Sequence, residues 1–197
     1  MKKLIVTTAV CALLSGAAFA QEGPWMVRAR AVGLDMANKD GTSLGLSVNN
    51  KTIPEVDISY FFNQNVAVEV ILTVPQKQTV HSSALATDLG TFKHLPPTAT
   101  LQYHFDGSAD VKPYVGAGIN YTRITQVNLL SGGAGLENHS WGTALQAGVD
   151  FPIDKNLSFN LDIKKVNIKT DVFVAGVNSG VLKLNPTLIG VGMGYRF

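Results

Sequence analysis

The sequence predicts an all-β fold, a single eight-stranded antiparallel transmembrane β-barrel with short periplasmic turns and long extracellular loops. Three observations predict it. Apolar residues alternate with small or charged ones, short and long connectors follow one another in turn, and the charges occupy the strand face opposite the apolar face. A lipid-facing apolar row around a polar lumen requires this arrangement.

The last segment of the chain shows the alternation most clearly. Every second residue from Ile189 to Phe197 is apolar, and the positions between them hold glycine or arginine. A period of two places these two sets on opposite faces of one strand. The terminal aromatic residue, Phe197, is also the expected contact for the barrel-assembly machinery.

Residues 1–20 have the features of a cleaved export signal. Two lysines precede an apolar run from Leu4 to Leu14, and Ala18-Phe19-Ala20 fits the small-x-small cleavage rule. We therefore expect residues 21–197 to form one exported barrel domain. Cys11 is the single cysteine and lies within the signal, so the exported domain is expected to lack disulfides.

Composition favours a membrane barrel and excludes some alternatives. Charged residues are only 15% of the chain, yet no part of the exported domain has the pattern of a spanning helix. The best candidate, Val172–Tyr195, is interrupted by glycines, a proline and Lys183. An apolar exported chain without a spanning helix is typical of a barrel. The formal net charge of +2 gives no electrostatic reason to expect nucleic acid as a partner.

Eight alternating segments are expected to form the strands. Most have about the 9–11 residues with which a tilted strand crosses the hydrocarbon layer. The segments are Trp25–Asp35, Pro54–Phe62, Val66–Val74, Pro97–Phe105, Lys112–Arg123, Ser140–Phe151, Leu157–Ile168 and Lys183–Phe197.

The connectors alternate in length. The short ones are rich in Asp, Asn, Gly and Pro, as tight turns require. They are Asn63–Asn65, Asp106–Val111 and Pro152–Asn156, and the long ones are Met36–Ile53, Pro75–Pro96, Ile124–His139 and Lys169–Leu182. Connector length alone leaves a soluble up-and-down barrel, such as a lipocalin, open.

Side-chain facing separates these two possibilities. One face of the second segment is apolar, with Val56, Ile58 and Tyr60, and the opposite face holds Glu55 and Asp57. Buried charges must be paired, so we expect a lumen crossed by ion pairs. The expected lumen charge network consists of Arg28, Arg30, Glu55, Asp57, Glu69, Asp150, Asp162, Lys164 and Arg196.

Aromatic residues gather at the strand ends beside the short turns and the C-terminus. This placement predicts an aromatic girdle at the periplasmic interface. The girdle residues are Trp25, Tyr60, Phe62, Tyr103, Phe105, Phe151, Phe159, Tyr195 and Phe197, whereas Tyr121 and Trp141 lie towards the long loops.

Several stretches carry a family resemblance. They are Trp25–Arg30, Lys93-His94-Leu95-Pro96-Pro97-Thr98, Leu101-Gln102-Tyr103-His104-Phe105, Lys112–Thr122 and the ending Gly194-Tyr195-Arg196-Phe197. Through these residues the chain resembles the OmpW family, which includes the AlkL-type alkane-uptake proteins. Asn185-Pro186 departs from the family's commoner Asp-Pro. The resemblance implies an eight-stranded barrel in the Gram-negative outer membrane and passage of small hydrophobic molecules. The loops match poorly, so it implies no particular solute.

The long loops are unusually apolar, and they suggest a hydrophobic basin above the charged lumen. A molecule taken up there would leave sideways into the bilayer, since ions below would have to lose water to admit it. Prolines at strand tops, Pro54, Pro97 and Pro186, lack an N–H and could mark the exit. The alternative is that the loop residues only pack on one another. The candidate basin residues are Leu44, Leu46, Val48, Phe92, Leu129, Phe173, Val174 and Leu182.

The histidines give no sign of catalysis. None of the four is spaced as a metal pair, and no Ser/His/acid grouping stands out, so we expect no enzyme, metal or cofactor. His104 faces inward beside Gln102 and is expected to be hydrogen-bonded. Arg123 and Lys165, near the outer rim, could contact lipopolysaccharide phosphates or simply snorkel at strand ends.

Three functions remain open from the sequence. The favoured one is a passive outer-membrane channel for small hydrophobic solutes, which would also accept detergent. The second is a structural or adhesion barrel with a sealed lumen, whose loops bind a host, phage or lipid partner. The third is a membrane enzyme acting on acyl chains, for which no catalytic grouping is found.

Overall fold

The computed structural model describes residues 23–107 and 110–197. The export signal expected at residues 1–20 lies outside these ranges. Within them the only helical element is a 3-10 turn at Leu130–Gly132. None of the described segments is a helix long and apolar enough to cross a membrane.

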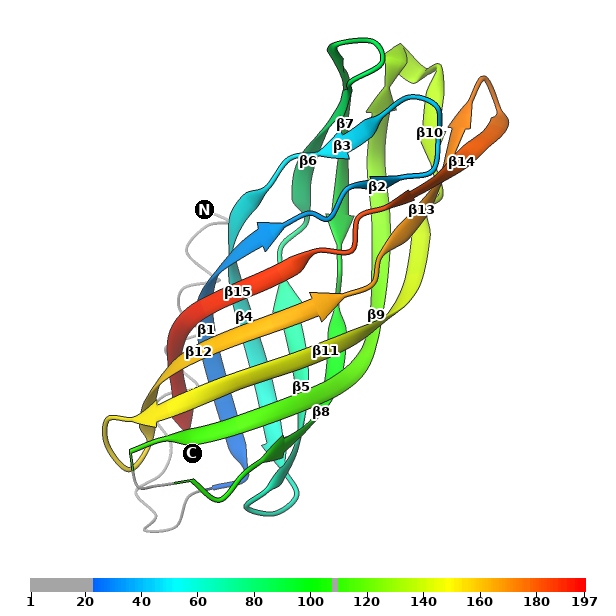
Figure 1. Ribbon diagram of the computed structural model, residues 1–197. Helices are drawn as coiled ribbons and strands as arrows, with labels where there is room; N and C mark the ends of the chain where they lie inside the picture. The colour runs from blue at the N-terminus through cyan, green and yellow to red at the C-terminus, as the bar shows by residue number, and fades with distance from the viewer. Residues whose placement is uncertain (1–22, 108–109) are drawn as a thin grey trace, which may run out of the picture.

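The predicted eight-stranded antiparallel barrel is confirmed. The strands pair in the order β1-β4-β5-β8-β9-β11-β12-β15, and β15 returns to β1. Figure 1 shows an elongated barrel with the short turns gathered at one end, together with the C-terminus. The barrel strands are β1 (Trp25–Asp35), β4 (Lys51–Phe61), β5 (Val66–Thr73), β8 (Thr98–His104), β9 (Lys112–Leu129), β11 (His139–Pro152), β12 (Leu157–Val166) and β15 (Thr187–Arg196).

The first and last strands close the barrel. Their ladder runs from Met26↔Arg196 to Asp35↔Thr187. Beyond it, the amide of Phe197 donates to the carbonyl of Trp25 over 2.9 Å. Because an even number of strands brings both chain ends to the same end of the barrel, the first and last strands run antiparallel and pair along this ladder, which closes the barrel.

The strand faces have the distribution expected of a membrane barrel. On β4, the side chain of Val56 is 43% exposed and that of Ile58 is 37% exposed, whereas Asp57 between them is fully buried. The same alternation continues on β12, where Leu161 and Ile163 face out and Asp162 and Lys164 face in. Apolar side chains outside and charged ones inside exclude the lipocalin-like alternative.

The long connectors contain strands that the sequence did not predict. The chain keeps pairing beyond the eight barrel strands and extends the wall on the long-loop side (Figure 1). The additional strands are β2 (Lys39–Asp40), β3 (Leu46–Val48), β6 (Gln76–Ser82), β7 (Thr87–Leu95), β10 (Ala134–Leu136), β13 (Lys169–Val174) and β14 (Val177–Lys183).

All predicted strands except β1 have somewhat different bounds in the structure, and two of these differences are connected with proline. Pro54 lies inside β4, opposite Ala31 of β1. It is tolerated there because β5 has ended at Thr73, so no ladder on that side requires its N–H. At the other end of the chain, Lys183 belongs to β14, because Asn185-Pro186 separates β14 from β15.

The additional strands form a second ring above the first. Ladders join β3, β6, β7, β9, β10, β13, β14 and β2 in this order. Side chains join β2 to β3. Asn38 exchanges two hydrogen bonds with the backbone of Val48, over 2.9 and 2.8 Å, and Asp40 accepts from the amide of Leu46 over 2.8 Å.

The aromatic girdle lies at the short-turn end, where the sequence predicts it. Neighbouring rings of the girdle contact one another. Trp25 on β1 and Tyr60 on β4, for example, have ring centroids 4.8 Å apart. Tyr103 and Phe105 form a similar pair at 5.1 Å. A separate aromatic pair, Tyr121 and Trp141, lies on β9 and β11 towards the long loops, with centroids 4.8 Å apart.

The outward face of the barrel can be tested with a charge. Leu161→Arg, on the outer face of β12, should lower the free energy of unfolding by about 2–4 kcal/mol, because arginine would face hydrocarbon. The measurement is urea unfolding of the barrel in lipid vesicles. Leu85→Arg is the control, since Leu85 is as exposed (54%, against 41% for Leu161) but lies in a long loop. Equal effects at both sites would contradict the membrane-facing assignment.

Candidate functional site

The barrel interior is divided into two zones along its axis. The zone nearer the short turns, which we name the polar plug, is built from inward positions of β1, β4, β5, β11 and β12. The zone nearer the long loops, which we name the apolar basin, is built from the strand tops and the second ring. The two zones arise because the inward-facing residues of a strand, as on β1 and β4, change from charged to apolar along its length.

Arg28 occupies the lower part of the polar plug and is fully buried. Its guanidinium makes a two-pronged contact with Asp150, with Nη2–Oδ2 2.8 Å and Nε–Oδ1 3.3 Å. The third nitrogen, Nη1, donates to Ser59 Oγ over 3.1 Å and lies 3.5 Å from Asp57 Oδ1. The guanidinium also faces the ring of Tyr114 at 5.3 Å. Each nitrogen of this buried cation therefore has a partner.

Arg30, two residues further along β1, contacts four carboxylates. It donates to Asp57 and, over 2.7 Å, to Glu69 Oε1. Its Nε lies 3.2 Å from Glu55 Oε1, and its Nη1 lies 3.4 Å from Asp162 Oδ2. Arg30 therefore joins carboxylates from β4, β5 and β12 at the centre of the plug.

Lys164 completes the upper side of the polar plug. Its Nζ donates to Glu55 Oε1 over 2.7 Å and lies 3.0 Å from Asp162 Oδ1. Three cations thus face five carboxylates, so neutral donors are needed to satisfy the remaining oxygens. Gln146 donates to Glu69 and Asp162, over 3.0 and 2.8 Å.

Glycines on β15 make room for the two arginines. Gly192 lies opposite Arg30 and Gly194 opposite Arg28 in the β1–β15 ladder. A Cβ at Gly192 would lie 2.7 Å from Arg30 Cγ, and one at Gly194 would lie 3.1 Å from Arg28 Cγ. The glycine face predicted for the last strand therefore accommodates large side chains of the adjacent strand.

Arg196 lies at the short-turn mouth of the barrel, below the ion-paired residues. Its guanidinium stacks over the ring of Phe61 at 4.0 Å, and its Nε donates to the carbonyl of Gly23 over 2.8 Å. His104, also at this level, lies 3.0 Å from Gln102 Oε1, which is the hydrogen-bonded lumen position expected for it. The structure thus brings together eight of the nine residues expected in the charge network and places Arg196 at the mouth.

A cavity of about 390 Å³ opens at this mouth. It is bounded by polar and apolar residues in similar measure, among them Met26, Phe61, His104 and Arg196. The buried carboxylate of Asp150 forms part of its inner end. The polar plug therefore separates this cavity from the apolar basin.

The apolar basin is a continuous cluster of buried side chains inside the long-loop half. Its members come from the tops of the barrel strands and from the second ring, which closes around them. The cluster contains Val32, Leu34, Met36, Leu46, Val48, Ile53, Val80, Leu89, Phe92, Ile124, Leu129, Leu136, Ala144, Val166, Ile168, Val172, Leu182, Leu184 and Leu188.

Most of the candidate basin residues meet in this cluster. Leu46, Val48, Phe92, Leu129 and Leu182 belong to it, and Leu44 packs against it. The remaining two, Phe173 and Val174, do not belong to the cluster. They lie beside a β-bulge at the tip of the β13–β14 hairpin and are only half-buried.

The apolar basin also contains two polar side chains that the sequence reading missed. Gln78 on β6 is fully buried, and no described group bonds either atom of its amide. His94 on β7 is 1% exposed and its Nδ1 likewise lacks a partner within the described chain. Burial, with a smaller effect from Lys51, lowers the pKa of His94 to about 4, so the ring is neutral. The parity of β6 and β7 would have placed both inside, had these strands been predicted.

A small cavity of about 20 Å³ lies where the apolar basin meets the polar plug. Glu55 and Lys164 bound it below, and Leu34, Leu188 and His94 bound it above. The volume suits about one water molecule, so the interior is filled by side chains at this level. Among residues 23–107 and 110–197, no group of three or more metal-ligating side chains could hold a metal ion.

These features define the class of protein. A closed antiparallel barrel with an apolar exterior, an ion-paired interior and aromatic residues near the short turns is an outer-membrane β-barrel. Comparisons with known proteins identify the family. The OmpW family matches residues 20–197, and the chain belongs to this family.

Individual proteins show the same relationship. The chain is 40% identical to an outer-membrane protein, y4mB, of Sinorhizobium fredii, over 88% of this chain and 80% of that protein. It is 35% identical to outer membrane protein W of Escherichia coli, over the full length of both. The crystal structure of OprG from Pseudomonas aeruginosa has a similar fold, with a TM-score of 0.76 and 23% identity, covering 90% of this chain and 97% of OprG.

The polar plug can be tested by removing one cation. Arg28→Met should lower the free energy of unfolding in lipid vesicles by about 3–5 kcal/mol, because it leaves the buried Asp150 carboxylate without its cation. Adding Asp150→Asn should recover part of this loss, since a neutral amide needs no counterion. If the two substitutions instead had purely additive costs, the Arg28–Asp150 contact would not be the source of the stability.

Proposed function

We propose that this protein admits small hydrophobic molecules from outside the cell into the apolar basin and releases them sideways into the outer membrane above the polar plug. The observation that carries the proposal is the order of the two zones. An apolar interior faces the long loops, and directly beneath it lie three cations and five carboxylates in mutual contact. An apolar solute can replace apolar side chains in the basin, but it cannot replace the partners of buried ions.

Membership of the OmpW family supports the proposal, because passage of hydrophobic molecules is what the resemblance implies. The size of the barrel supports the sideways route. The interior of an eight-stranded barrel is just wide enough for side chains, so a solute has no aqueous path past the plug. The exit must therefore lie in the wall.

The wall has a break that suits this exit. The β5–β8 ladder ends at Ile71↔Thr98, and the β6–β7 ladder begins at Gln76↔His94. Between them lie residues 72–75 and 95–97, which include Pro75, Pro96 and Pro97. The small cavity at the base of the basin reaches this break, since Thr73, Pro96 and Thr98 line it.

A similar break near Pro186 suits an exit less well. The β12–β15 ladder ends at Lys165↔Thr187, but other hydrogen bonds continue across the gap. The amide of Val166 donates to the carbonyl of Pro186 over 3.1 Å, and the amide of Ile168 donates to Asn185 Oδ1 over 2.9 Å. We therefore assign the exit to the break beside Pro96.

The second candidate function is a sealed barrel whose loops bind a host, phage or lipid partner. The filled interior favours it, since the cavity above the plug is only about 20 Å³. Under this alternative, the apolar side chains serve only to hold the second ring together. The two functions differ in whether the protein carries an apolar solute at all.

Uptake of an apolar solute by lipid vesicles that contain the protein distinguishes the two functions. Leu46→Ser with Leu182→Ser should slow uptake of an apolar solute several-fold, because both residues lie in the basin (3% and 0% exposed) and the new hydroxyls oppose an apolar occupant. Leu85→Ser with Val177→Ser is the control, since these loop residues are exposed (54% and 68%). An unchanged rate in the basin variant removes the basin from the route. A wild-type rate equal to that of protein-free vesicles establishes the sealed barrel.

The exit can be tested separately with a disulfide. If the β5–β8 register continued past Ile71↔Thr98, Thr73 would face Pro96. The double variant Thr73→Cys, Pro96→Cys should therefore form a disulfide across the break, and oxidation should slow apolar uptake by restraining the two strands. Reduction of the same preparation should restore the rate. Equal rates in the oxidised and reduced forms would place the exit elsewhere.

A further inference from the structure

Three lysines form a row across neighbouring strands on the outer surface. Lys169 of β13 lies directly opposite Lys183 of β14, and Lys183 lies directly opposite Lys39 of β2. All three are exposed. Residues that face each other across a ladder point to the same side of the sheet, so the three ammonium groups project outward together. We name this set the lysine row.

Taken alone, the lysine row destabilises the folded state. Like charges directly opposite one another destabilise a sheet. No ion pair is found for any of the three lysines in residues 23–107 and 110–197. Neighbouring carboxylates of the described chain form no ion pair with these lysines. Asp40 bonds Thr42 and Leu46, Asp171 lies on the same face as Lys169 without pairing with it, and Glu137, beside Asp171, lies 3.3 Å from His139 Nδ1. A row of this kind is suited to an external anion.

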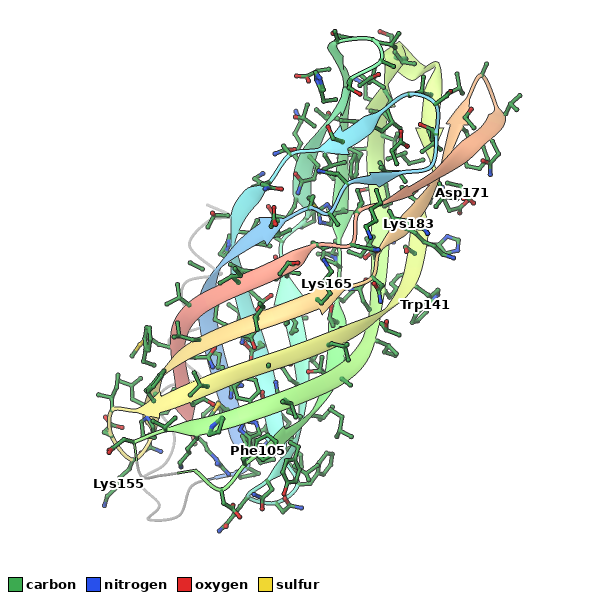
Figure 2. All side chains as sticks on the ribbon, viewed as in Figure 1. Phe105, Trp141, Lys155, Lys165, Asp171 and Lys183 are labelled. Atoms are coloured by element: carbon green, nitrogen blue, oxygen red, sulfur yellow. The ribbon has the colours of Figure 1, made fainter. Side chains whose placement is uncertain are left out.

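The height of the lysine row indicates which anion reaches it. Tyr121 lies opposite Trp141 in the β9–β11 ladder. The amide of Lys169 donates to Ser140 Oγ over 3.1 Å, so Lys169 lies beside the residue that precedes Trp141 on β11. Figure 2 shows Trp141 and Lys183 on the same face of the molecule. Paired aromatic rings of this kind mark the headgroup level of a membrane, so the ammonium groups lie at that level too.

We propose that the lysine row binds the phosphate groups of the outer-leaflet lipid, the lipid A part of lipopolysaccharide. Three adjacent ammonium groups match clustered phosphate oxygens, and each contact between two ions is stronger than a neutral hydrogen bond. Trp141 and Tyr121 lie beside the row and contact the same lipid. The site is on the outer surface and does not depend on solute transport.

Other basic residues near the rim are less suited to this role. Lys165 already has hydrogen-bond partners, since its Nζ donates to the Asn185 carbonyl and to Thr187 Oγ1, over 2.7 and 2.9 Å. Lys77 and Lys93 also face each other, on β6 and β7. However, Lys93 pairs with Thr125, four residues beyond Tyr121 on β9 and so about 13 Å further along the strand. This second pair lies above the aromatic level and provides a matched control.

Trp141 provides a local readout of lipid binding. The experiment uses the full exported domain in detergent micelles with Trp25→Phe, so that Trp141 is the only tryptophan. Lipid A is added, and the change in Trp141 fluorescence gives its apparent affinity. Lys169→Gln with Lys183→Gln should weaken binding at least tenfold. Asp171→Asn should strengthen it, because a carboxylate on the same face is neutralised.

Two comparisons decide the outcome. Lys77→Gln with Lys93→Gln removes the same charge from the lysine pair that lies above the aromatic level. This double variant should change the affinity for lipid A less than twofold. Dephosphorylated lipid A should bind the wild-type row at least tenfold more weakly. The proposal is overturned if the two double variants lose affinity equally, if neither loses affinity, or if removal of the lipid phosphates has no effect.

Discussion

The ion pairs that cross the barrel interior are the constraint on which the rest of the structure depends. An eight-stranded barrel in lipid leaves its interior little water, so each inward charge needs a partner inside the barrel. Arg28 and Arg30 meet this need by reaching carboxylates of four other strands. Their size in turn requires the glycines of β15, and their contacts tie distant strands in one register. The plug of ion-paired side chains then makes the upper half a separate compartment.

The sequence predicts the membrane-embedded part of this fold well, because strand alternation is local information. Inward residues such as Asp57 and Lys164 were identified by counting positions, and the β1 boundaries were predicted correctly. The partners within the plug could not be derived, since they depend on the register between strands far apart in the chain. The strands of the long connectors were missed because short pieces such as β2 and β3 carry too few residues for a period to show. Gln78 and His94 were missed because they lie on β6 and β7, which were not predicted as strands.

The barrel therefore changes its chemical character along its length. Towards the periplasm it has a mixed polar cavity with Arg196 at its edge, then a layer of ion-paired residues, then an apolar interior enclosed by the second ring. On the outside, aromatic rings mark both ends of the lipid-facing band, and the lysine row begins beside the outer pair, at Lys169. The interior surface thus changes from charged to apolar, and the exterior from apolar to charged, at a similar level. A strand that has left the hydrocarbon layer no longer needs an apolar outer face, so its apolar side chains can face inward.

The junction between β2 and β3 has a mechanical consequence. Elsewhere neighbouring strands of the second ring pair through their backbones, but between β2 and β3 the side chains of Asn38 and Asp40 supply the bonds. Such a junction can part by rotation about a few side-chain torsions, without unravelling either strand. At this point the second ring is therefore closed by side chains and not by a ladder, whereas the spanning wall is closed by the β1–β15 ladder.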